Sequence, residues 1–248
     1  MIPVLTLLTV TAIGIAYFVF GQGLWVISGL AFLTLLTRFN KKTRAFGKFV
    51  ELLFIFCFIS FLINQFGIYY PYSLIIVLTF AVILIFFEGP EWSQLYFLKG
   101  NSKNYLKLSL GFATFVVFLY LLWIYFKRSS IPNPVPLHWP IDTLIILGIG
   151  FAIYLSMTEE IIFRSFIFER AKTVAGANWA IPIQGTFYGL MHYRSGVPNG
   201  LEGVLLGGLF GMGLGYLVKK TSSIYLSIFV HFIVTLLVFV ELSILSMS

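Results

Sequence analysis

Residues 142–168 read DTLIILGIGFAIYLSMTEEIIFRSFIF, and this stretch decides the fold class. Its apolar run is longer than the roughly 20 residues that an α-helix needs to cross a bilayer. Two adjacent carboxylates, Glu159 and Glu160, nevertheless lie inside it, followed by Arg164. Ionisable groups within spanning helices are rare and by default mark functional sites. The stretch therefore predicts both a membrane helix and a site within it.

The composition of the whole chain is also typical of a membrane protein. Of its 248 residues, 59% are hydrophobic and 10% are charged, whereas soluble domains carry about 25% charged residues. Open β-strands would leave backbone groups unpaired in lipid, so only helices are expected. We therefore expect an all-α, polytopic transmembrane helix bundle with eight or nine spans. The apolar runs lie near residues 2–20, 24–37, 50–68, 72–87, 106–126, 142–168, 178–192, 201–218 and 224–246.

The positive charges predict how the chain is oriented. If the N-terminus is cytoplasmic and all nine runs span, then 13 of the 16 Lys and Arg residues fall on the inner side. Only Lys127, Arg128 and Arg194 remain outside, as the positive-inside rule predicts. No basic stretch is interleaved with aromatics, so nucleic acid is not an expected partner. The chain is compact and lacks eukaryotic extensions, so we expect the cell membrane of a prokaryote.

Two halves are expected within one membrane domain. Residues 1–130 are expected to form N-terminal membrane helices, and residues 131–248 are expected to form membrane helices that carry the candidate catalytic side chains. The single cysteine, Cys57, excludes an internal disulfide framework and a cysteine-rich zinc site. A stripe of glycines at every fourth position predicts a helix face that another helix approaches closely. These glycines are Gly203, Gly207, Gly211 and Gly215.

Two of the three histidines also lie in apolar runs, at the depth of the carboxylates. Glu159 and His192 lie symmetrically about the turn that joins the sixth and seventh runs, which gives them the same depth. His231 is 11 residues beyond Lys220, and Glu159 is 11 residues before Arg170, so each lies roughly 16 Å from the inner edge. Side chains from three helices are therefore expected to meet.

The residue types in this group predict hydrolysis. A carboxylate beside imidazoles in a low-dielectric cavity is suited to deprotonating water. Glu160 and Arg164, four residues apart, share a helix face and can form an ion pair. Glu159 lies about 100° round the helix and can face another partner. His231, with the Thr235 hydroxyl one turn away, could stabilise an oxyanion. Cleavage of a peptide bond inside the membrane is the predicted chemistry.

The order and spacing of these residues resemble the CAAX-prenyl protease and bacteriocin-processing (CPBP, Abi) family of intramembrane endopeptidases. That family carries E-E-x-x-x-R, then F-x-x-x-H, then H-x-x-x-N or a similar small polar residue. The resemblance covers about residues 141–241. The residues at the positions of the pattern are Glu159, Glu160, Arg164, Tyr188, His192, His231 and Thr235.

Two positions depart from the family pattern. Tyr188 stands where the pattern has Phe, and Thr235 stands where the best-known members have Asn. A threonine hydroxyl can donate a hydrogen bond, but it reaches less far than an amide.

The resemblance implies a role for each matching residue and a class of substrate. Glu159 would activate water with the help of His192, and His231 and Thr235 would hold the carbonyl oxygen. The implied partner is a membrane-anchored protein or peptide substrate in the lipid bilayer, cut near its C-terminus or its anchor. The implied supporting residues are Glu160 and Arg164.

Three alternatives to this interpretation stay open. Glu159, His192 and His231 would just suffice as zinc ligands, although no H-E-x-x-H motif is present. The resemblance implies a metal-free glutamate mechanism, and we therefore expect no cofactor. A non-enzymatic bacteriocin self-immunity or peptide-binding membrane protein is slightly favoured by Thr235. A transporter could use the same charges as a proton relay, but matching halves with broken helices are not found.

Overall fold

The computed structural model describes residues 2–38, 43–68, 75–76, 78–80, 82–83, 95–98, 100–127 and 140–247. The regular secondary structure in these ranges is helical, so the predicted all-α class is confirmed. In chain order the helices are α1 (Ile2–Gly14), the π-helix η1 (Ile15–Val19), α2 (Gly23–Arg38), α3 (Arg44–Gln65), the 3-10 helix η3 (Ser102–Tyr105), α5 (Leu106–Lys127), α6 (Ile141–Glu160), the π-helix η5 (Ile161–Ile167), α7 (Phe168–Ala175), α8 (Ala177–Ser195), α9 (Gly200–Thr221) and α10 (Tyr225–Met247).

Helices in the described part of the chain are long and apolar enough to make this an integral, multi-pass membrane protein. Shorter apolar stretches lie in α2 and α10. The predicted run 72–87 lies mostly outside the described residues, and the expected eight or nine spans are not confirmed. The five long candidate spans are Ile2–Val19, Arg44–Gln65, Ser102–Lys127, Ile141–Ala175 and Gly200–Thr221.

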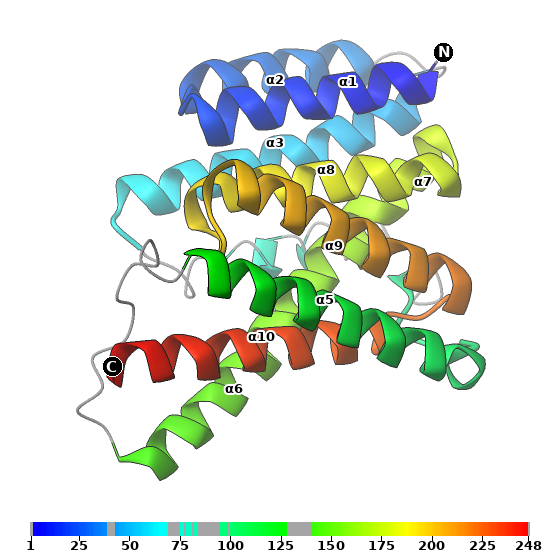
Figure 1. The fold of residues 1–248 in the computed structure, drawn as a ribbon. Coiled ribbons are helices and arrows are strands. Elements are labelled where there is room, and N and C mark those ends of the chain that lie inside the picture. The colour runs from blue at the N-terminus through cyan, green and yellow to red at the C-terminus, as the bar shows by residue number, and fades with distance from the viewer. Residues whose placement is uncertain are drawn as a thin grey trace.

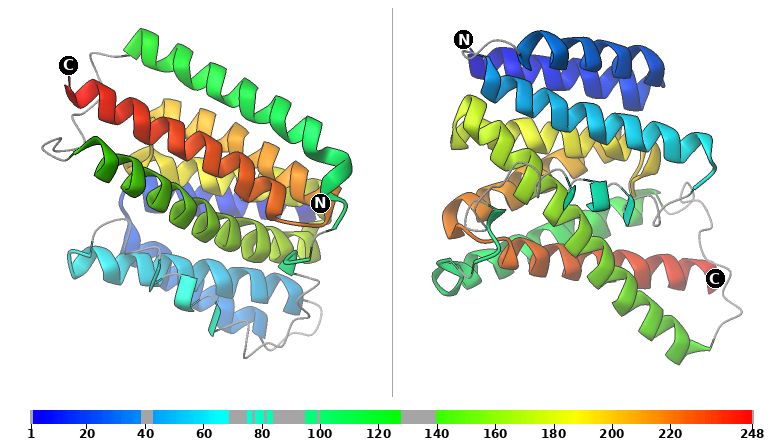
Figure 2. Two further views of the ribbon diagram at one scale, coloured as in Figure 1. Left: turned by 90° about the horizontal axis from the view of Figure 1, so that it is seen from below. Right: turned by 180° about the vertical axis from the view of Figure 1, so that it is seen from behind.

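The helices form a stack with α8 and α9 at its centre. Figure 1 shows α1, α2 and α3 on one side, α5, α6 and α10 on the other, and α8 and α9 between them. Most helix axes run roughly parallel, while α6 crosses the others obliquely (Figure 2). The side chains of Glu159, Glu160 and His231, on α6 and α10, are nevertheless buried.

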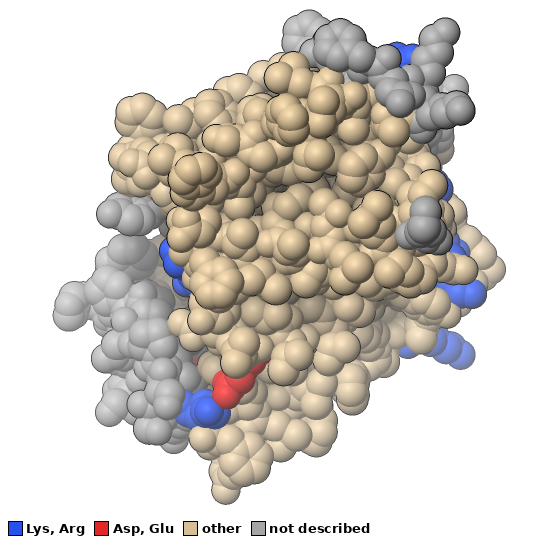
Figure 3. All heavy atoms as spheres, turned by 90° about the horizontal axis from the view of Figure 1, so that it is seen from above, with Lys and Arg blue, Asp and Glu red and all other residues tan. Residues whose placement is uncertain are grey.

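Charged side chains gather at the ends of the helices. On the face shown in Figure 3, lysines and arginines lie at the two ends, and the broad surface between them is uncharged. Three chain segments meet at one end of the stack (Figure 1): the N-terminus, the end of α9 and the beginning of α10. An uncharged band between charged ends is the surface that a bilayer requires, because its core solvates apolar side chains and excludes charged ones.

The glycine stripe packs α9 against α8. A Cβ atom at Gly211 would lie 3.2 Å from the Cα of Gly185. On α8, a Cβ atom at Gly189 would lie 2.4 Å from the carbonyl oxygen of Val204, closer than real Cβ atoms approach. Small residues let two backbones meet in this way. The prediction of a closely packed glycine face is confirmed.

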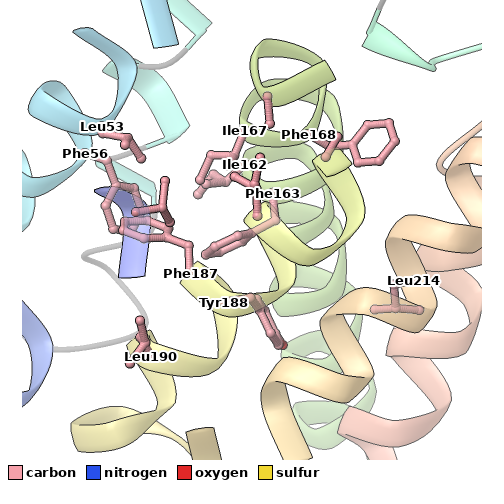
Figure 4. Packing of buried hydrophobic residues seen from close by; sticks show 14 of the residues in the cluster. Leu53, Phe56, Ile162, Phe163, Ile167, Phe168, Phe187, Tyr188, Leu190 and Leu214 are labelled. Atoms are coloured by element: carbon pink, nitrogen blue, oxygen red, sulfur yellow. The ribbon is translucent and has the colours of Figure 1, made fainter. Parts of the chain in front are cut away.

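Aromatic rings join α3 to the C-terminal half. Phe56 of α3 packs edge-on against Phe187 of α8, with ring centroids 5.4 Å apart. It also packs edge-on against Phe163 of η5, at 6.2 Å. These rings meet in the core shown in Figure 4. Each such pair contributes about 0.5–1.5 kcal/mol beyond the burial of its surface, so these rings stabilise the packing of α3 against η5 and α8.

Candidate active site

The two predicted carboxylates lie where α6 passes into a π-helix. Glu159 and Glu160 are the last residues of α6, and Arg164 lies within η5. π-helical turns inside α-helices are rare and occur frequently at functional sites. All three side chains are almost completely buried.

Glu160 and Arg164 form the predicted ion pair. The Nε atom of Arg164 lies 3.2 Å from Oε2 of Glu160, and neither side chain has exposed surface. The pair lacks hydrogen-bond geometry at these two atoms, so its attraction is electrostatic. The guanidinium also lies over the ring of Tyr188, with Cζ 4.9 Å from the ring centroid. A buried charge needs such partners, because desolvation is otherwise strongly unfavourable.

His231 of α10 lies between the two carboxylates. Its Nδ1 atom is 2.8 Å from Oε1 of Glu160, and its Nε2 atom is 3.7 Å from Oε2 of Glu159. A carboxylate can only accept a hydrogen bond, so Nδ1 is the donor to Glu160. This bond fixes the ring and directs Nε2 toward Glu159.

His192 of α8 is oriented by the backbone of its own helix. Its Nδ1 atom lies 2.9 Å from the carbonyl oxygen of Tyr188. A carbonyl only accepts, so Nδ1 carries the proton and Nε2 is left as an acceptor. The ring rests on Tyr188, with centroids 4.5 Å apart. Gly207 of α9 leaves room on the other side, where a Cβ atom would lie 3.1 Å from Cγ of His192.

A large cavity connects these groups. Its volume is about 1180 Å³, and its walls come from η1, the first residue of α2, α3, α5, α6, α8, α9 and α10. The walls are mainly apolar and aromatic. Glu160 and Arg164 lie behind the wall and do not line the cavity. The polar side chains that the prediction singled out and that do line it are Glu159, His192, His231 and Thr235.

The structure brings the predicted site residues to one place. Glu159, Glu160 and Arg164 come from α6 and η5, His192 from α8, and His231 from α10, with the Thr235 side chain 7% exposed at the same cavity. Gln184 of α8 donates a hydrogen bond from Nε2 to the carbonyl oxygen of Gly211 of α9 at 2.7 Å, which joins the two helices beside this site. His138 lies outside the described residues.

Sequence reasoning missed one polar contact. The Tyr188 hydroxyl donates a hydrogen bond to Oε2 of Glu159 at 2.9 Å. The F-x-x-x-H pattern singles out His192. At position 188 it specifies phenylalanine, an aromatic ring without a hydroxyl. The signal that could have found the contact is the substitution of Phe by Tyr, because a hydroxyl buried in a membrane helix needs a partner.

The zinc alternative has no prearranged ligand set in this geometry. Among the described residues, no three His, Cys, Asp or Glu side chains are arranged to hold one metal ion. Nδ1 of His231 is taken by Glu160 and Nδ1 of His192 by a carbonyl. A zinc ligand approaches the metal to about 2.0–2.2 Å, so these side chains would have to move to meet at one ion.

Comparison with protein families gives one match. The family model described as Type II CAAX prenyl endopeptidase Rce1-like matches residues 141–237. Neither the curated proteins nor the solved structures compared with the chain include one that matches it. The matched range extends from α6 to α10 and contains Glu159, Glu160, Arg164, His192, His231 and Thr235.

Proposed function

Residues 141–237 form an Rce1-like domain of the type II CAAX prenyl endopeptidase family, a family of proteases, and from this premise we propose that the chain is a glutamate-dependent intramembrane endopeptidase. The observation that carries the proposal is the meeting of one carboxylate and two imidazoles at a single cavity inside an apolar helix bundle. Water that enters such a cavity meets a base in a low-dielectric environment, where acid–base chemistry is effective.

Glu159 is the proposed base. It lines the cavity, while Glu160 is turned away and paired with Arg164 and His231. Glu159 takes a proton from water, and the resulting hydroxide attacks the carbonyl carbon of the peptide bond. The same proton is passed to the leaving nitrogen as the C–N bond breaks. His192 faces the cavity with an acceptor nitrogen that can hold the water.

His231 and Thr235 are the proposed stabilisers of the oxyanion. When His231 carries a second proton, its Nε2–H can donate into the cavity while Nδ1–H remains bonded to Glu160. The Thr235 hydroxyl, one helical turn away on α10, lines the same cavity. One oxyanion donor is worth about 10²–10³-fold in rate in enzymes where it has been removed. Glu160 and Arg164 support the charge and orientation of His231.

The proposed substrate is a membrane-attached protein or peptide, cut near its C-terminus or its anchor. The mainly apolar walls of the cavity support this class, because they would accommodate a lipid-attached or apolar segment next to the polar group. We further propose that the chain has eight or nine spans, with the lysine- and arginine-rich helix ends in the cytoplasm.

Mass spectrometry of the C-termini of membrane-attached proteins tests the function. Cells carrying the wild type are compared with cells carrying Glu159→Gln at equal expression. A shortened product should disappear with Glu159→Gln, because loss of a general base slows such reactions by about 10²–10⁴-fold. The position of the new C-terminus identifies the cleavage site.

Identical C-termini in both strains would refute the protease and favour the non-enzymatic alternative. A self-immunity or peptide-binding protein could tolerate Glu159→Gln. The variant keeps the volume of the side chain and the oxygen that accepts from Tyr188. Equal melting temperatures of the two purified proteins therefore serve as the control for folding.

A further inference from the structure

Tyr188 contacts three members of the proposed catalytic group. Its hydroxyl donates to Oε2 of Glu159 at 2.9 Å. One neighbour of its ring is His192, with centroids 4.5 Å apart, and another is the guanidinium of Arg164, 4.9 Å from the ring centroid. The side chain is 2% exposed, and Figure 4 shows it projecting from α8 on the side of α9.

The hydroxyl distinguishes the two oxygens of Glu159. Oε2 receives the hydrogen bond from Tyr188 and also faces Nε2 of His231 at 3.7 Å. No residue in the described ranges donates a hydrogen bond to Oε1. A carboxylate has about four lone-pair sites on its two oxygens, so the sites of Oε1 stay available to water in the cavity.

Packing alone does not explain the hydroxyl. The ring meets Phe163 edge-on, with centroids 4.9 Å apart, and a phenylalanine ring would make the same contact. Burying a hydroxyl without a partner is unfavourable, and here its partner is the proposed base itself. The ring of Tyr188 therefore packs in the core, and its hydroxyl hydrogen-bonds Glu159.

We propose that Tyr188 is a positioning residue of the cleavage site, whose hydroxyl holds Oε2 of Glu159 so that Oε1 takes the proton from the attacking water. This inference rests on the proposed protease function. Arg164 contributes indirectly, because the same guanidinium pairs with Glu160 and faces the Tyr188 ring. The supporting ion pair is thus connected to the base through one aromatic side chain.

Steady-state kinetics of Tyr188→Phe test the inference. The probe is a synthetic peptide that spans the cleavage site found by mass spectrometry, anchored in liposomes. A hydroxyl that positions the base acts on the chemical step, so kcat should fall roughly 10-fold while KM stays the same. The matched control is Tyr193→Phe on the same helix, since Tyr193 does not line the cavity and should keep both constants.

Infrared difference spectroscopy distinguishes a positioning role of Tyr188 from a purely structural one, because it reports on the hydrogen bond to the Glu159 carboxylate. The carboxylate band lost in Glu159→Gln identifies Glu159. This band should shift in Tyr188→Phe, which removes the hydrogen bond, and should keep its frequency in Tyr193→Phe.

The possible failures can be told apart. If the wild type cleaves the peptide and Tyr188→Phe cleaves it with the same kcat, the positioning role is refuted and the protease stands. A loss of folding in Tyr188→Phe would assign the hydroxyl to stability and also overturn the positioning role. If the wild type itself produces no cleavage at any membrane-attached C-terminus, the protease is refuted, and the positioning role with it.

Discussion

The N-terminal helices and the Rce1-like domain line one cavity but contribute different side chains to it. From η1, α3 and α5 the cavity receives mainly aromatic and aliphatic walls, whereas from α6, α8 and α10 it receives a carboxylate and two imidazoles. The N-terminal walls need only shape and apolarity. The polar side needs buried partners for each charge, so each of its positions depends on several others.

This comparison predicts that a buried ion pair on the polar side of the cavity contributes far more to stability than an exposed pair at the helix ends. Arg164→Met would leave Glu160 buried without its counter-charge, since both side chains have no exposed surface. Removing one partner of a buried pair destabilises a protein by about 3–5 kcal/mol. Thermal unfolding in detergent should show a large drop in melting temperature.

The matched control is Lys127→Met. Lys127 pairs with Glu202 at 2.8 Å, but the two side chains are 46% and 43% exposed, and pairs that water reaches contribute little. Its melting temperature should match that of the wild type. Equal drops in melting temperature in Arg164→Met and Lys127→Met would contradict the comparison, because burial would then not matter for the Glu160–Arg164 pair.

Glycines provide the second test, with an intermediate effect. Gly207→Ala would place Cβ 3.1 Å from Cγ of His192. This close contact should rotate the His192 ring, which is oriented by its hydrogen bond to the carbonyl oxygen of Tyr188. Small displacements of catalytic groups can cost up to 10²-fold in rate, so cleavage should fall roughly 10-fold with the fold retained. The measurement is the initial rate of peptide cleavage in liposomes.

The control for this variant lies in α2. A Cβ atom at Gly29 would meet nothing within 4 Å, and alanine is the better helix former by about 1 kcal/mol. Gly29→Ala should therefore keep the cleavage rate and the melting temperature of the wild type or raise the latter slightly. A cleavage rate that is unaffected by Gly207→Ala would show that the position of His192 is not critical.

The smallest effect is expected at the N-terminal wall. Leu119 of α5 lines the cavity, so Leu119→Ala removes apolar contact with the proposed substrate. A loss of about 1 kcal/mol raises KM roughly 5-fold with kcat unchanged, because contact made equally in the ground and transition states affects only binding. Kinetics with the same peptide separate the two constants.

Leu121→Ala is the control on the same helix. Leu121 is 50% exposed and does not line the cavity, so KM should stay unchanged. If Leu119→Ala lowered kcat instead, the N-terminal wall would take part in the chemistry, and the contrast between the two regions would fail.

The charged and imidazole side chains of the cavity could be found in the sequence because ionisable residues are rare in membrane-spanning helices. Glu159, Glu160 and His231 are conspicuous in apolar runs, and helical rise alone brings them to one depth. The hydroxyl contact of Tyr188 could not be found in this way, since a tyrosine in an apolar helix is common. Its partner depends on the angle between α6 and α8.

The sequence by itself determined the helical class, the membrane environment, the closely packed glycine face of α9 and the family domain. These properties follow from composition and from local spacing, which act within one helix or between neighbours. Only the tertiary structure decided which imidazole nitrogen faces which carboxylate and that the Tyr188 hydroxyl meets Glu159. These choices depend on the rotation and crossing of helices that are far apart in the chain, and they are fixed by packing over many residues at once.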